Sequence, residues 1–128
     1  MTPFPVIRDY DLPSINNVKS GFSGADVFDD KLFFTLAVEN TTNAIDDGEV
    51  FGSFVGWMPA SKVSNMKGST KDENTIQGTV QLMYDDKPYI GKVESISVYE
   101  KDADKYIALA VTDSDGGDSE ILMLEIEL

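Results

Sequence analysis

The chain has 128 residues, no cysteine and no histidine, and carries a formal net charge of −13 with an isoelectric point near 4.1. Without those two residue types it cannot form disulfides, cysteine-based zinc sites, or Ser-His-Asp or Cys-His catalytic groups from this chain alone. The negative charge disfavours direct binding to nucleic-acid phosphates or an anionic membrane, and is compatible with cation binding, a basic partner or plain solubility.

The N-terminal segment MTPFPVIRDYDLP is proline-rich and predicts an extended entry, with an edge strand through Val6 and Ile7. It has no basic segment followed by an apolar one, so no signal peptide is predicted. We therefore expect a cytoplasmic protein, or a secreted or periplasmic one if the chain is cut from a longer precursor. No apolar run approaches the roughly 18–20 residues that a membrane-spanning helix needs.

Alternating apolar and polar residues, separated by turn residues, predict an all-β antiparallel fold with no strong helix. The expected strands cover residues 22–28, 32–39, 50–58, 75–84, 92–99, 105–112 and 120–128. Turns are expected at 29–31 and 85–88, and the polar stretch 60–74 is expected to be a flexible connection. The chain is thus predicted to be a single all-β domain over residues 1–128.

The two halves of the chain resemble each other. LFFTLAVE (32–39) aligns with the later strand when Leu36-Ala37-Val38 is placed on Leu109-Ala110-Val111. Each half then consists of a strand, a turn, a strand, an acidic loop and a third strand, which divides the domain into blade-like units over 14–58 and 75–128. Such a repeat favours about two β-propeller blades, with the segment from residue 75 as an outer strand, and the alternative is a β-sandwich.

Two blades cannot close a ring, since propellers typically need about four to eight. We therefore expect either a homo-oligomer that completes a ring or association with the rest of a parent chain.

The run FFTLAVENTTNAIDDGEVFGSFVGWM (33–58) resembles a bacterial family numbered 6929 among the domains of unknown function (DUF6929), whose members carry the form YFTASVE…DDGE…GSxxG. The later run, residues 91–126, resembles the same family's closing blade, where K-(V/I)-E-G precedes an acidic VTDxDD…SE stretch. Ser95 departs from this pattern, because members usually have glycine there. The resemblance implies the C-terminal portion of a Bacteroidetes β-propeller with phytase-like and esterase-like relatives, and implies no established activity.

Two acidic loops are the candidate metal sites. Clustered carboxylates beside glycines suit Ca²⁺, which binds six to eight oxygens, although the spacing is not that of an EF-hand. The candidate ligands are Asp46, Asp47 and Glu49 in the first loop and Asp113, Asp115, Asp118 and Glu120 in the second. The alternative is that both are solvated hairpin tips.

Two further carboxylates are candidates for a channel along a propeller axis. Glu94 lies on an alternating strand, on the face that also carries Ile96 and Val98, and Glu39 ends the corresponding central strand. A carboxylate on an apolar face costs free energy unless it is paired, so a functional role competes with simple emergence into solvent at a strand end.

Three functions are compatible with these features, and we favour a non-catalytic binding module for a divalent cation or a protein partner through the acidic loops. The first alternative is a metal-dependent phytase-like or esterase-like hydrolase, which needs no histidine. The second is an acidic protein that mimics nucleic acid or blocks a basic partner. No catalytic residue is assigned, and an enzyme is the less favoured reading. Ca²⁺ is the one cofactor considered.

Overall fold

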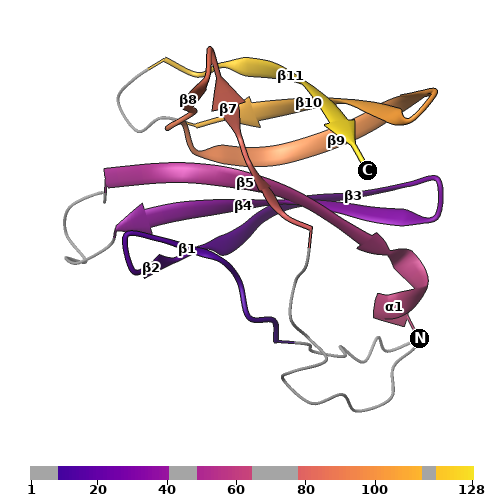
Figure 1. Cartoon of the computed structure of the whole chain (residues 1–128), viewed down its shortest axis with the longest axis horizontal. Coiled ribbons are helices and arrows are strands. Elements are labelled where there is room, and N and C mark those ends of the chain that lie inside the picture. Colours follow the sequence, from indigo (N-terminus) through magenta and orange to yellow (C-terminus); the bar gives the residue numbers. More distant parts are fainter. Residues whose placement is uncertain (1–8, 41–48, 65–77, 114–117) are drawn as a thin grey trace, which may run out of the picture.

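The computed structural model describes residues 9–40, 49–64, 78–113 and 118–128. These residues form a nearly all-β domain with two main antiparallel sheets stacked on each other (Figure 1), which confirms the predicted fold class. The expected edge strand through Val6 and Ile7 lies outside the described residues. No helix in the described ranges is long and apolar enough to cross a membrane.

The first sheet has the strand order β3-β4-β5-β6. Its strands are β3 (Gly21–Phe28), β4 (Lys31–Asn40), β5 (Glu49–Pro59) and β6 (Val80–Gln81). Asp29 and Asp30 join β3 to β4 with φ angles of 53° and 58°. Positive φ at both central positions is the geometry of the tight turn that matches the twist of a hairpin. The three strands predicted over 22–58 are therefore confirmed to within one residue at each end.

The second sheet has the order β11-β10-β9. It contains β9 (Val93–Asp102), β10 (Lys105–Thr112) and β11 (Ile121–Glu127). The pairing of β9 with β10 skips Glu94 and Tyr99, so each is the extra residue of a β-bulge. The strict alternation predicted for 92–99 is therefore wrong at its start. The bulge turns Val93 inward beside Ile96 and Val98, and removes Glu94 from their buried face.

Short elements complete the fold. They are β1 (Ser14–Ile15), β2 (Val18–Lys19), α1 (Ala60–Ser64), β7 (Met83–Tyr84) and β8 (Lys87–Pro88). The single strand predicted to run through to Tyr84 is divided instead. Leu82 separates β6 from the β7–β8 hairpin, because its N–H donates to the Ser53 carbonyl while its own carbonyl accepts from the Tyr89 N–H. The connection predicted over 60–74 begins with the helical turn α1. Its residues from 65 on, and the predicted strand's residues 75–77, lie outside the described residues.

Both faces of the first sheet are buried, which makes β4 the most buried strand. Between the two sheets lies a core formed by Phe33, Val55, Ile96, Val98, Tyr106 and Ala108. On the opposite face lies a second core formed by Phe34, Leu36, Val38, Phe54 and Met58. Tyr10, Leu12, Ile15, Val18 and Val63 cover this second core from the N-terminal segment and α1. The near-continuous apolar run of β4 follows from this position, since a strand buried on both faces does not alternate.

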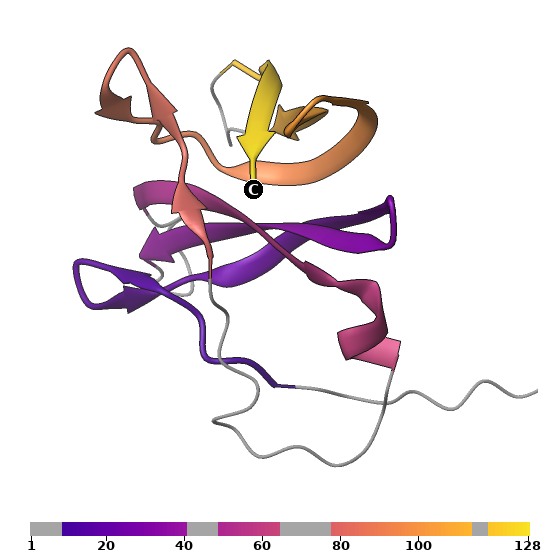
Figure 2. The same cartoon turned by 45° about the vertical axis from the view of Figure 1, so that its right-hand side comes forward.

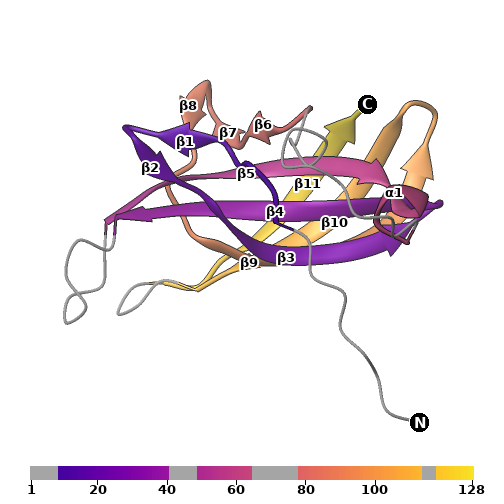
Figure 3. The ribbon, with the colours of Figure 1, turned by 90° about the horizontal axis from the view of Figure 1, so that it is seen from below.

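The two sheets are held together along their first strands, β3 and β9 (Figures 2 and 3). A Cβ atom at Gly24 would lie 2.8 Å from the Ser95 Cα. The Asp26 carboxylate accepts a 2.7 Å hydrogen bond from the Val98 N–H. The buried Ser53 hydroxyl donates to the Gly91 carbonyl at 2.9 Å and accepts from the Val93 N–H at 3.2 Å. Polar contacts to backbone groups therefore fix β9 against the first sheet.

In the stack, equivalent faces of the two sheets look in the same direction. In β4 the even-numbered Leu36 and Val38 face away from the second sheet, and in β10 the even-numbered Tyr106 and Ala108 face toward the first. Aligning the two hairpins on their turns places Lys31 on Lys105, one residue away from the alignment of the two Leu-Ala-Val runs. With this hairpin alignment, equivalent faces of the two sheets look in one direction.

The close approach at Gly24 generates a stability prediction. Gly24→Ala should lower the free energy of unfolding by about 1–3 kcal/mol, because its Cβ meets backbone that cannot rotate away. The matched control is Gly21→Ala in the same strand, where nothing lies within 4 Å. This control should change stability by less than about 0.5 kcal/mol. Urea unfolding measures both, and equal stabilities of the two variants would contradict the β3–β9 contact.

Candidate functional site

The two predicted channel carboxylates come together on one lysine. Lys92 Nζ lies 2.9 Å from Glu39 Oε2 and 3.3 Å from Glu94 Oε1. Glu39 is near the end of β4, Lys92 immediately precedes β9 and Glu94 is the second residue of β9, so this ion triad bridges the two sheets. It also joins the two sequence runs that carry the family resemblance. Glu94 is therefore ion-paired and only half-buried, rather than placed on an apolar face.

The triad favours the charged form of its lysine. The hydrogen bond to Glu39 raises the pKa of Lys92, and partial burial opposes this effect. A lysine whose pKa is higher in the folded state stabilises the fold fully below its unfolded value of about 10.4. The contribution is lost as the pH rises above that value. The triad is thus a structural joint at neutral pH.

The described residues that flank the two acidic loops lie at one end of the stacked sheets (Figure 1). Glu49 begins β5, Asp113 follows β10, and Asp118 and Glu120 precede β11. Asp46, Asp47 and Asp115 lie outside the described residues. Over the ranges that the structure does describe, no group of three or more acidic side chains is arranged to hold a metal ion. The metal assignment therefore stays a prediction.

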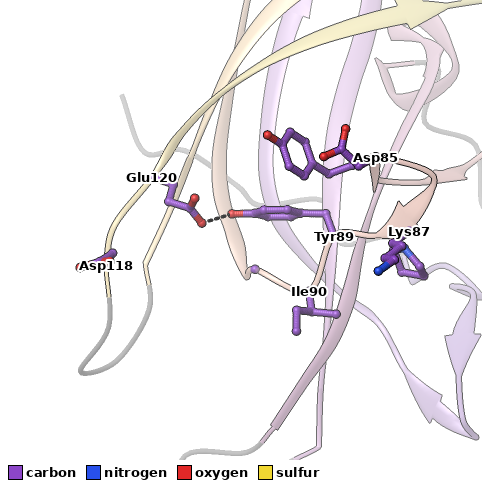
Figure 4. A pocket seen from close by; sticks show the side chains of 9 residues that line it. Asp85, Lys87, Tyr89, Ile90, Asp118 and Glu120 are labelled. Atoms are coloured by element: carbon purple, nitrogen blue, oxygen red, sulfur yellow. Dashed lines mark hydrogen bonds between the residues drawn. The ribbon is translucent and has the colours of Figure 1, made fainter.

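A cavity of about 730 Å³ opens beside this end of the molecule, between the β7–β8 hairpin and the start of β11 (Figure 4). Two tyrosines, Tyr84 and Tyr89, line it together with the carboxylates of Asp85, Asp118 and Glu120. Lys87 and Ile90 also contribute. The hairpin turn at Asp85 and Asp86, with φ angles of 50° and 61°, projects Tyr84 and Lys87 on its two short strands. We call this cavity the tyrosine pocket.

One hydrogen bond spans the tyrosine pocket. The Tyr89 hydroxyl donates to Glu120 Oε1 at 2.6 Å. Glu120 is itself positioned by Thr112, whose Oγ1 accepts from the Glu120 N–H at 3.0 Å and whose N–H donates to the Glu120 carbonyl. Partial burial, followed by the bond to Glu120, raises the pKa of Tyr89. The pocket therefore holds a protonated phenol against a carboxylate at neutral pH.

Sequence reasoning identified the acidic half of this pocket and missed the aromatic half. Asp118 and Glu120 belong to the predicted acidic loop, whereas Tyr84 falls in a predicted strand, Asp85 in a predicted turn and Tyr89 in no predicted element. The available signal was two tyrosines flanking a tight two-residue hairpin. Nothing in the sequence indicates that this hairpin folds against a loop 31 residues further along the chain.

Comparison with known proteins identifies the family to which the chain belongs. The model of DUF6929, a family of unknown function, matches residues 1–126. The chain belongs to the DUF6929 family. This confirms the resemblance seen in the sequence, and the family name carries no activity with it. No curated protein and no solved structure matches this DUF6929 domain.

The ion triad predicts the effect of removing its lysine. Lys92→Met keeps the length of the side chain and leaves Glu39 and Glu94 without their shared cation. We expect a loss of about 1 kcal/mol in unfolding free energy at pH 7, since the triad is partly exposed. The double variant Lys92→Met/Glu94→Gln should recover part of it, because the repulsion between carboxylates is removed. A double variant no more stable than Lys92→Met would contradict the arrangement.

The tyrosine pocket predicts an anomalous titration. Tyr89 should ionise at higher pH than an unperturbed tyrosine, whose pKa is about 10. The contribution of Tyr89 to the free energy of unfolding is fully present below the pKa of an unperturbed tyrosine, and it is lost as the pH rises above that pKa. Ultraviolet titration of the phenolates should show a late-titrating component that Tyr89→Phe removes. If the absorbance lost in Tyr89→Phe belongs to a component that titrates at about pH 10, the raised pKa of Tyr89 is contradicted.

Proposed function

We propose that this DUF6929 domain is a non-catalytic binding module built as two consecutive propeller-like blades, and that its tyrosine pocket receives a basic side chain of a protein partner. The proposal has two parts, the architecture and the ligand. Each rests on different observations.

The blade architecture is supported by how the two sheets stack. The order β3-β4-β5 in the first sheet corresponds to the order β9-β10-β11 in the second. Equivalent faces of the two sheets look in the same direction. The first strands β3 and β9 lie side by side, and β6 occupies the outer position expected for a fourth strand. Consecutive blades around an axis share these features, whereas the two sheets of a sandwich related by a two-fold axis would turn equivalent faces toward each other.

Among the residues that the structure describes, one blade face is left open to a neighbouring blade. The N-terminal segment and α1 already cover the far face of the first sheet. The outer face of the second sheet carries the exposed apolar side chains Leu109, Val111, Ile121 and Met123. Association with a parent chain or another subunit is therefore expected through the second sheet. A ring of identical chains would first require the N-terminal layer to move.

The ligand class follows from the side chains of the tyrosine pocket. Tyrosine rings attract cations over their faces, and carboxylates pair with lysine and bind arginine through two parallel hydrogen bonds. Tyr84 is largely exposed and Glu120 is held in place by Thr112. A cavity of about 730 Å³ has ample room for one long side chain. The acidic charge of the whole chain would also draw in a basic partner.

One observation favours a basic side chain over a divalent ion. The carboxylates of Asp85, Asp118 and Glu120 line one cavity, yet the described residues contain no group of three acidic side chains close enough to share a metal ion. A compact Ca²⁺ ion needs its oxygens within about 2.6 Å, whereas an extended guanidinium can reach separated carboxylates. The spacing therefore fits an organic cation better.

The test is calorimetric titration at low ionic strength with the peptide acetyl-Gly-Arg-Gly-Arg-Gly-amide. Its counterpart with citrulline in place of arginine has nearly the same shape without the charge. We expect saturable binding of the arginine peptide only. Glu120→Gln and Tyr84→Ala should weaken it about fivefold or more, as expected for losing one charged hydrogen bond or one cation–π contact.

The matched controls are Glu100→Gln and Tyr99→Ala, which make the same changes at exposed positions of β9 outside the tyrosine pocket. They should leave the affinity within twofold of the parent chain. If both pairs of variants weaken binding equally, the attraction is general and the pocket is not the site. A rise in melting temperature with millimolar Ca²⁺, without peptide binding, would support the cation reading instead.

A further inference from the structure

The C-terminal strand β11 has a backbone edge that faces away from its sheet. Over the described residues, β11 pairs only with β10. The Thr112 N–H donates to the Glu120 carbonyl, so Leu122, Leu124 and Ile126 direct their backbone groups toward β10 by the alternation of an antiparallel ladder. Met123 and Glu125 therefore direct theirs outward. This edge can accept another strand.

The position beside β11 corresponds to an occupied position in the first sheet. That sheet places β6 beside its third strand, β5, in the order β3-β4-β5-β6. The second sheet repeats the order through β9, β10 and β11 and has no described fourth strand. An added strand on β11 would give the two sheets the same number of strands.

An apolar groove of about 590 Å³ runs along this edge, between β11 and the β5–β6 side of the first sheet. Trp57, Leu82, Leu124 and Ile126 line it, and these partly buried side chains pack against the core between the sheets. Val80 and Met123 also line it and are 65% and 70% exposed. Figure 3 shows the C-terminal end of β11 reaching the edge of the molecule at which β6 lies. A strand in this groove would finish burying an incompletely covered core.

The charges beside the groove select the chemistry of its occupant. Glu125 and Glu127 are both exposed on β11, and Lys105 lies 3.6 Å from each. One lysine between two carboxylates leaves a net negative charge. Alternate residues of an incoming strand would face Leu124 and Ile126 or would lie next to Glu125 and Glu127. The first set should be apolar and the second set lysine or arginine. A second copy of this chain fits poorly, because each copy carries a net charge of −13.

We propose that β11 binds an extended segment of another polypeptide, with alternating apolar and basic residues, as the fourth strand of its sheet. Main-chain hydrogen bonds to the β11 edge supply affinity, and the groove and the two glutamates supply specificity. The site shares no residue with the tyrosine pocket. Either proposal can therefore fail while the other stands.

The experiment uses the intact chain and the peptide acetyl-Lys-Val-Lys-Val-Lys-Val-Lys-amide. Trp57 is the single tryptophan of the sequence and lines the groove, so its fluorescence reports occupancy. The control peptide has proline in place of each valine, which keeps the charge but holds φ at about −65°, a backbone conformation that does not continue a β-ladder. We expect a saturable change in Trp57 emission with the valine peptide and none with the proline peptide.

Two variants locate the site. Met123→Pro removes an N–H that points away from β10, a position where an edge strand tolerates proline, and Met123→Ala is its matched control. Met123→Pro should bind the peptide about fivefold more weakly than Met123→Ala, as expected for one lost hydrogen bond. If the Met123→Pro variant does not fold, a second variant that reverses the charge at two positions tests the same site. Glu125→Lys/Glu127→Lys should lose the lysine peptide and gain the peptide with glutamate in its place.

Three results would overturn the proposal. The first is no saturable Trp57 signal with the valine peptide, and the second is equal affinity for the valine and proline peptides. The third is a concentration-dependent mass in sedimentation equilibrium that Met123→Pro abolishes, which would assign the edge to a second copy of this chain.

Discussion

The joint between β3 and β9 is the contact on which the rest of the structure depends. Gly24 lets the two backbones approach, and Asp26 accepts a hydrogen bond from the β9 backbone. Ser53 of the neighbouring strand β5 adds two hydrogen bonds to backbone groups at the start of β9. Buried polar groups that bond backbone are specific, because a shift of one residue leaves them unsatisfied. This joint fixes where β9 starts. The ion triad, the tyrosine pocket and the groove all lie on segments whose positions follow from it.

The functional features lie at the boundaries between elements. The tyrosine pocket forms where the β7–β8 hairpin meets the start of β11, and the groove forms where β11 passes the edge of the first sheet. The Lys92 triad joins the end of β4 to the start of β9. A domain of stacked sheets thus offers two surfaces of different chemistry. We propose that the tyrosine pocket receives a single basic side chain and that the groove receives an extended strand.

The strands were predictable from sequence because their signals are local. Alternation and turn residues located the hairpin at Asp29-Asp30 and the strand Lys105–Thr112. The bulge at Glu94 was not predictable, because a bulge inserts one residue without changing the composition of the strand. It moved a carboxylate off the apolar face where strict alternation had placed it. At Leu82 the chain passes from the ladder with β5 into the β7–β8 hairpin, because the Leu82 N–H bonds to Ser53 and its carbonyl to Tyr89. The pairing with Ser53 joins residues far apart in sequence, which no local pattern encodes.

The candidate sites were only half predictable for the same reason. Acidic residues are easy to recognise as candidates in a sequence, so Glu39, Glu94 and Glu120 were selected. Their partners Lys92 and Tyr89 were not, because the fold alone brings them close. The internal repeat shows the same limit. The shared Leu-Ala-Val run suggested one register, and the hairpin turns show that equivalent residues are displaced by one.

The central claim is that the two sheets stack in the same direction with β3 against β9. Nuclear Overhauser contacts in solution test it most directly. We expect contacts between Gly24 and Ser95 and between the rings of Phe33 and Tyr106, whose centroids lie 5.1 Å apart. Contacts from the Leu109 or Val111 methyl groups to Phe33 or Val55, in place of these, would contradict it.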